Sequence, residues 1–94
     1  MRLDITRNAE RDLARIRAYI RQENATAARQ VVAGILDGIQ VLLAHPDIGR
    51  PGRIEETCEL VLTGLPYIVC YAAGSETVSV LRVLHGSQQW IEAV

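Results

Sequence analysis

Near the N-terminus, the spacing of hydrophobic residues changes from that of a strand to that of a helix. Leu3 and Ile5 alternate with polar residues, which predicts a short strand over residues 2–6. Thr6 or Asn8 can cap the helix predicted from about residue 8 to residue 23, where the apolar positions recur with helical spacing and acidic residues fall in the first turn. Arginines cover the outer sides of this helix, and we interpret them as a solvated face rather than a patch for an anionic partner: Arg11, Arg15, Arg17 and Arg21.

A wider apolar stripe predicts a second helix over residues 25–44, with Asn24 as its N-cap. The connection between the two helices is short, which indicates an antiparallel helical hairpin. Gly34 and Gly38 lie one turn apart inside the second helix, and each costs about 1 kcal/mol relative to alanine. We expect a close approach of another backbone to compensate, and we favour the first helix over an external partner.

The C-terminal half reads as three strands, over residues 58–63, 66–72 and 76–84. The last strand has apolar side chains on both faces, as a central strand covered on two sides requires. Arg82 interrupts it and must find a carboxylate, backbone carbonyls or a phosphate, because an unpaired buried charge is costly. His85 follows directly, so we expect function at this strand end. The order of elements predicts one α+β domain over residues 1–94, in which a strand, an antiparallel helical hairpin and a three-stranded antiparallel meander follow one another and the helices pack on one sheet face.

Composition narrows the class of protein. The net charge is −1 and all ten basic residues are arginine, so the molecule as a whole does not attract nucleic acid strongly. The sequence shows no signal peptide and no uninterrupted apolar run of membrane-spanning length, which predicts a cytoplasmic protein. Cys58 and Cys70 are too few for a disulfide framework or a zinc site, and whether they ever pair stays open. His45 and His85 are far apart, so we expect no metal and no organic cofactor.

Four segments in order resemble toxins of the RelE/ParE superfamily, which bacteria encode beside a neutralising antitoxin in type II toxin-antitoxin modules. They are AERDLARIRAYI, HPDIGRPGR, LPYIVCYA and VLRVLHGSQQW, and together they extend over nearly the whole chain. The resemblance implies a cognate antitoxin as partner. It also implies one of two targets, since some members cut messenger RNA on the ribosome and others inhibit DNA gyrase, and a shared fold does not decide between them.

The ribonuclease alternative, similar to RelE, would use Arg53 and Arg82 for the phosphate and His85 as acid or base, with a carboxylate from Glu55, Glu56 or Glu59. The absence of lysine and the negative net charge speak against a ribosome-bound enzyme. Arg82 and His85 also have opposite parity on a regular strand, so they converge only if the chain bends or bulges near Leu84.

The RVLHG ending, the PYIVCYA strand and the GRPGR loop resemble ParE-like sequences more closely than RelE-like ones, and we favour inhibition of DNA gyrase. A non-toxic member that only binds is a third alternative. In the favoured interpretation, six residues are candidates for antitoxin or target binding: Gly34, Gly38, Arg50, Arg53, Arg82 and Trp90.

Overall fold

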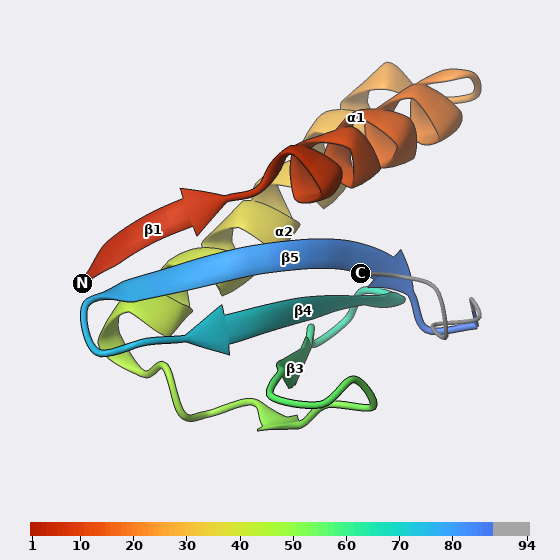
Figure 1. Ribbon diagram of the computed structural model, residues 1–94. Coiled ribbons are helices and arrows are strands. Elements are labelled where there is room, and N and C mark those ends of the chain that lie inside the picture. Colours follow the sequence, from red (N-terminus) through yellow and green to blue (C-terminus); the bar gives the residue numbers. More distant parts are fainter. Residues whose placement is uncertain (88–94) are drawn as a thin grey trace.

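The computed structural model describes residues 1–87, which fold into a five-stranded mixed sheet with two helices packed on one of its faces (Figure 1). The order of strands in the sheet is β1-β5-β4-β3-β2. The elements are β1 (Arg2–Ile5), α1 (Arg7–Arg21), α2 (Ala25–Ala44), β2 (Arg50–Pro51), β3 (Cys58–Val61), β4 (Tyr67–Ala73) and β5 (Thr77–His85).

The predicted α+β class and the order of its main elements are confirmed. β1 runs parallel to β5, and β3, β4 and β5 form the antiparallel meander. The short strand β2 was not predicted, because its two residues fall in a loop rich in proline and glycine. It pairs with β3 through Arg50 opposite Glu59 and Pro51 opposite Cys58.

Thr6 joins the first strand to the first helix and is the N-cap of α1. Its hydroxyl accepts the N–H of Ala9 at 3.3 Å and donates to the carbonyl of Val80 at 2.9 Å. The helix therefore begins at Arg7, so that Asn8 lies inside it. Asn24 caps α2 as predicted, since its side chain accepts the N–H of Ala27 at 3.0 Å.

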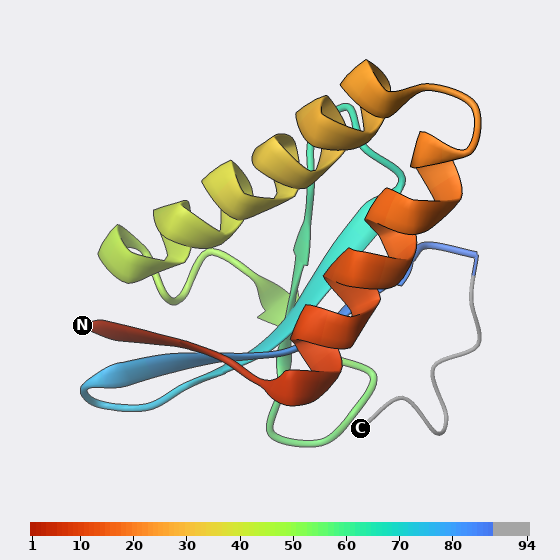
Figure 2. The ribbon, with the colours of Figure 1, turned by 90° about the horizontal axis from the view of Figure 1, so that it is seen from above.

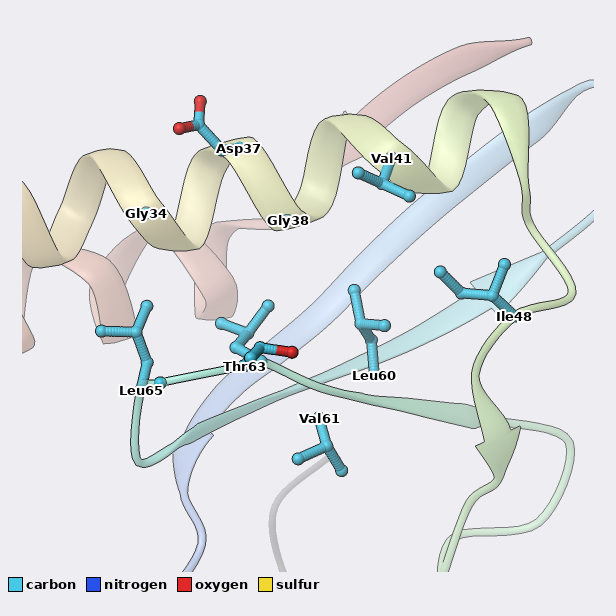
Figure 3. A pocket seen from close by; sticks show the side chains of 11 residues that line it. Gly34, Asp37, Gly38, Val41, Ile48, Leu60, Val61, Thr63 and Leu65 are labelled. Atoms are coloured by element: carbon cyan, nitrogen blue, oxygen red, sulfur yellow. The ribbon is translucent and has the colours of Figure 1, made fainter.

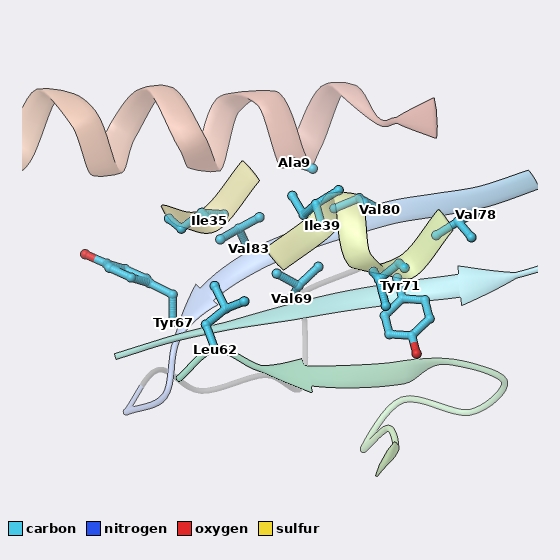
Figure 4. Close-up of a cluster of buried hydrophobic side chains, with 11 residues drawn as sticks. Ala9, Ile35, Ile39, Leu62, Tyr67, Val69, Tyr71, Val78, Val80 and Val83 are labelled. Carbon is cyan, nitrogen blue, oxygen red and sulfur yellow. The ribbon is translucent and has the colours of Figure 1, made fainter. Parts of the chain in front are cut away.

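The main core lies between the helices and the sheet (Figure 4). α1 contributes Ala9, and α2 contributes Ile35, Ile39 and Leu42. Leu62 follows the end of β3, and the sheet contributes Tyr67, Val69, Tyr71, Val78, Val80 and Val83. A smaller cluster of Ile68, Cys70 and Leu84 lies on the other face of the sheet, with Ile54 and Leu81 against it. Apolar residues of β5 thus reach both faces, as the sequence predicted.

The second helix has a length and mean hydropathy that would allow it to cross a membrane. Core helices share both properties, and four residues of α2 are buried: Ala28, Ile35, Ile39 and Leu42. Arg29 and Asp37 interrupt its apolar sequence. We therefore describe α2 as a core helix, packed against the sheet and against α1 (Figure 2).

Candidate functional site

A groove lies between α2 and the β3–β4 hairpin, and we call it the α2 groove (Figure 3). It has a volume of about 450 Å³. Most of the side chains that line it are aliphatic. Three of these side chains are unusually exposed for large hydrophobic residues: Val41 at 44%, Ile48 at 48% and Val61 at 52%. The lining residues are Gly34, Asp37, Gly38, Val41, Ile48, Leu60, Val61, Leu62, Thr63, Gly64 and Leu65.

Gly34 and Gly38 form the helical wall of the α2 groove, and their close neighbours are leucine side chains of this chain. A Cβ on Gly34 would lie 3.1 Å from Cδ1 of Leu65, and one on Gly38 would collide with Cδ2 of Leu62. The compensation is therefore internal, but the expected approach of a backbone and the expected role of the first helix were both wrong, because leucine side chains of the β3–β4 hairpin fill the space.

The edge of the sheet beside the α2 groove is open for part of its length. β2 covers β3 only opposite Cys58 and Glu59. In the described part of the chain, Leu60 and Val61 pair with β4 on one side and with no strand on the other. Exposed apolar side chains thus border an unpaired strand edge, the combination that lets an extended segment of another protein add to a sheet.

On the face of the sheet away from the helices, four residues stand in register across four strands, and we call them the charged row: Arg50, Glu59, Cys70 and Arg82. The Glu59 side chain is 2% exposed and holds two arginines. Its Oε1 accepts Arg50 Nη2 at 3.0 Å, and its Oε2 accepts the backbone N–H of Arg53 at 2.9 Å. The guanidinium Nε of Arg53 lies 3.4 Å from the same Oε2.

The ionisation of Glu59 is decided by these partners. Burial alone would raise the pKa of its carboxyl group, but the N–H of Arg53, the hydrogen bond from Arg50 and the two positive charges outweigh burial. The pKa of Glu59 is therefore lowered, and the carboxylate stays charged. It fixes two half-exposed guanidinium groups, one on β2 and one in the following loop.

Arg82, at the other end of the charged row, finds the carboxylate that the sequence required. Its Nε and Nη2 donate to the two carboxylate oxygens of Asp12 at 2.7 and 2.9 Å. The hydrogen bond to Asp12 is the main cause of the raised pKa of Arg82. Asp12 also accepts the backbone N–H of Val83 at 2.9 Å. β1 ends at Ile5 and so cannot pair with Val83. The carboxylate of Asp12 takes its place by accepting this N–H at the edge of β5.

His85 does not join the arginines. His85 stands opposite Tyr67 in the β4–β5 pair, whereas Arg82 stands opposite Cys70. The rings of His85 and Tyr67 meet edge-on, with 5.6 Å between their centroids. Tyr67 belongs to the core on the helical face and Cys70 to the cluster on the other face. Arg82 and His85 therefore point to opposite faces.

The irregularity in β5 lies at Leu81, between the residues that pair with Cys70 and Tyr71. It comes before Arg82 and so does not bring Arg82 and His85 together, as a bend near Leu84 would have done. The Nδ1 of His85 is engaged locally by Ser87, from its N–H at 3.1 Å and its hydroxyl at 2.7 Å. Trp90, the remaining candidate, lies outside the described residues.

The two cysteines also point to opposite faces. Cys70 is buried in the small cluster and Cys58 packs against the main core. Glu59 stands opposite Cys70, so Cys58 is one residue out of register on the neighbouring strand. In the described range, no group of three or more histidine, cysteine, aspartate or glutamate side chains could hold a metal ion.

Two site residues escaped the sequence analysis. Asp12 is one of the acidic residues near the start of the first helix, where the helix dipole favours negative charge, but its side chain is 4% exposed and binds Arg82. Tyr71 looked like one more apolar strand residue. Its hydroxyl donates to the carbonyl of Pro46 at 2.8 Å and accepts the N–H of Gly49 at 3.0 Å, which ties the loop after α2 to the sheet. The polar tip of a buried tyrosine was the available signal.

Comparison with known proteins agrees with this architecture. The family model described as "ParE toxin of type II toxin-antitoxin system, parDE" matches residues 3–90. The chain is 45% identical over 89 residues to "Putative toxin Y4kP" of Sinorhizobium fredii (strain NBRC 101917 / NGR234), covering 95% of this chain and 92% of the relative. It is similar to a solved structure titled "Chromosomal ParDE TA system from P. aeruginosa", with a TM-score of 0.80 and 25% identity, covering 90% of this chain and 95% of that chain. The chain therefore belongs to the ParE toxin family of type II toxin-antitoxin systems.

Proposed function

We propose that this toxin arrests growth by binding and inhibiting DNA gyrase, and not by cutting messenger RNA. One observation carries the choice: Arg82 is bonded to the buried Asp12 and faces away from His85. A ribonuclease of this type needs a phosphate-binding cation and an acid or base at one reacting centre. Inhibition by binding makes no such demand. A gyrase target would also place the protein in the cytoplasm, as the sequence predicted.

Supercoiling of relaxed plasmid by purified gyrase tests this proposal. The wild-type chain and an His85→Ala variant should inhibit supercoiling at similar concentrations, because His85 has no part in a binding surface built elsewhere. Expression of each protein in cells should arrest growth equally. If gyrase is unaffected while the wild type arrests growth and His85→Ala does not, the target is messenger RNA and the proposal is wrong. If neither protein affects growth or gyrase, the chain is a member that only binds.

We propose that the antitoxin silences the toxin by laying an amphipathic segment along the α2 groove and the open edge of β3. Membership in the ParE family implies such a partner. The groove offers exposed aliphatic side chains for apolar anchors, and the edge offers backbone groups for an added strand. Segments of this kind are often disordered before they bind and fold on the surface that they cover.

A matched pair of variants on α2 tests where the antitoxin binds. Val41 lines the groove and is 44% exposed, while Leu36 is 38% exposed on the same helix but outside the groove. Val41→Glu should prevent co-purification with the product of the adjacent gene, because a charge would be buried in the interface. Leu36→Glu should leave it unchanged. Equal effects of both variants would contradict a groove-centred interface.

A further inference from the structure

The exposed face of α1 is unusually basic for a protein with a net charge of −1. This helix carries half of the ten arginines of the chain and only two acidic residues, Glu10 and Asp12. Asp12 is buried and bound to Arg82. The five arginines are all exposed: Arg7, Arg11, Arg15, Arg17 and Arg21. The near-neutral total thus hides a helix of net charge +3 on an otherwise acidic molecule.

The chain itself hardly neutralises these arginines. Within residues 1–87, only Arg15 has a carboxylate within ion-pair distance, and this is Asp12 at 3.9 Å. Asp12 already accepts Arg82 at 2.7 Å, so it offers Arg15 little. The α1 arginines are therefore not held in place by the fold, in contrast to Arg50, Arg53 and Arg82.

Their arrangement also works against the helix that carries them. Arg7 and Arg11, Arg11 and Arg15, and Arg17 and Arg21 are like-charge pairs four residues apart, each destabilising by roughly 0.2–0.5 kcal/mol. Arg7 is the first residue of α1, where the helix dipole disfavours a cation. Glutamine would form the helix as well without this repulsion. Helix stability therefore does not explain the arginines.

The arginines form two rows along the helix. With about 100° between successive residues, Arg7, Arg11 and Arg15 make one row and Arg17 and Arg21 the other. The strip between the rows begins at Glu10, an exposed carboxylate, and continues with Ala14 and Ala18, which are exposed and small. The opposite side of α1 packs on α2 and the sheet (Figure 2). The five arginines are exposed, and Arg17 lies where α1 borders Val32 of α2. A broad ligand could approach the strip closely and meet guanidinium groups on both sides.

We propose that this face of α1 binds the phosphate backbone of duplex DNA without regard to sequence. The guanidinium group of arginine can donate two hydrogen bonds to the oxygens of one phosphate. A duplex presents one negative charge per about 1.7 Å along its axis. Such a ligand suits a surface that has positive charges but few apolar side chains. An acidic protein segment would need buried apolar anchors to bind well. On α1, Tyr19 is the one large apolar side chain that is highly exposed, at 73%. This inference replaces our interpretation of the arginines as a solvated face.

Fluorescence anisotropy of a labelled mixed-sequence duplex of about 20 base pairs, measured with the purified full chain between roughly 50 and 200 mM salt, tests the proposal. The variants are Arg7→Gln/Arg11→Gln and, as control, Arg2→Gln/Arg29→Gln. The control removes the same charge from exposed arginines on β1 and α2. We expect the affinity of the wild type for the duplex to fall steeply as salt rises. In Arg7→Gln/Arg11→Gln, the slope of log K against log salt should become shallower by about 2. The control should keep the wild-type slope.

Three outcomes would overturn the proposal: no binding of the wild type at about 50 mM salt, equal losses in both variants, or displacement of the duplex by polyglutamate at equal charge concentration. Circular dichroism would confirm that each variant is folded. If the first variant fails to fold, Arg17→Gln/Arg21→Gln tests the other row. Gyrase is absent from this assay, so its result stands apart from the supercoiling experiment.

Discussion

The ion pair between Asp12 and Arg82 is the contact whose loss we expect to destabilise the fold most. Asp12→Ala leaves a guanidinium that is only 17% exposed without its carboxylate, and it leaves the N–H of Val83 without an acceptor. Breaking a buried ion pair by removing one partner costs about 3–5 kcal/mol. Some water reaches Arg82, so we take about 3 kcal/mol for the charge and add about 1 kcal/mol for the orphaned N–H.

The expected total of about 4 kcal/mol is a large share of the 5–15 kcal/mol that stabilises a typical domain. Urea denaturation followed by circular dichroism would measure it, and the m-value should stay unchanged because the same surface is exposed on unfolding. Asp12→Asn should lose about half as much, since it keeps an acceptor but not the charge.

The double variant Asp12→Ala/Arg82→Met separates the pair from its surroundings. Arg82→Met alone should also be strongly destabilising, because it leaves the buried carboxylate of Asp12 with only the exposed Arg15, at 3.9 Å, as a cation. The double variant leaves no unpaired charge and should lose about 2–3 kcal/mol less than the sum of the single variants. Additive losses, or a loss below about 1 kcal/mol for Asp12→Ala, would refute the reasoning.

Three further predictions follow from the loop and the two sheet faces. Gly49→Ala should cost about 1–3 kcal/mol, because its Cβ would lie 2.5 Å from the Tyr71 hydroxyl and 2.9 Å from a backbone oxygen, whereas Gly86→Ala, with 3.7 Å to its nearest atom, should be tolerated in thermal unfolding. The pKa of Glu59 is lowered in the folded state, so its contribution to stability is complete at pH above its ordinary pKa of 4.5 and is lost as pH falls through the lower pKa of the folded state. When stability is measured against falling pH, Glu59→Gln should lack this part of the loss of stability. Cys58 should react with a thiol reagent in the native protein before Cys70, whose pKa is raised by burial, and mass spectrometry should find no disulfide between them.

The sequence predicted what depends on local pattern. Periodicity located both helices, Asn24 located the second cap, and the apolar run of the last strand placed it in the interior of the sheet. Arg82 was correctly expected to need a partner, but the identity of the partner was out of reach. Asp12 lies 70 residues away along the chain, and only the packing of α1 across the end of β1 brings the two together.

The candidate site was harder to predict because it depends on register. Strand parity indicated that Arg82 and His85 diverge, but a bulge could have reversed this, and its position at Leu81 is not marked by a glycine or proline. β2 was missed because Arg50 and Pro51 have no strand pattern of their own. They pair because Glu59, buried by tertiary packing, draws Arg50 to the edge of β3.

The parallel pairing of β1 with β5 has a consequence for the synthesis of the toxin. Thr6 donates to the carbonyl of Leu81, a residue 75 positions later in the chain. A nascent chain therefore holds its first strand and first helix without their sheet partner until Leu81 has been added. Chain growth at about 5–20 residues per second leaves the early helices unable to close the core for several seconds. The native surface can therefore form only after β5 has been translated, so an antitoxin already present can meet the toxin as it folds.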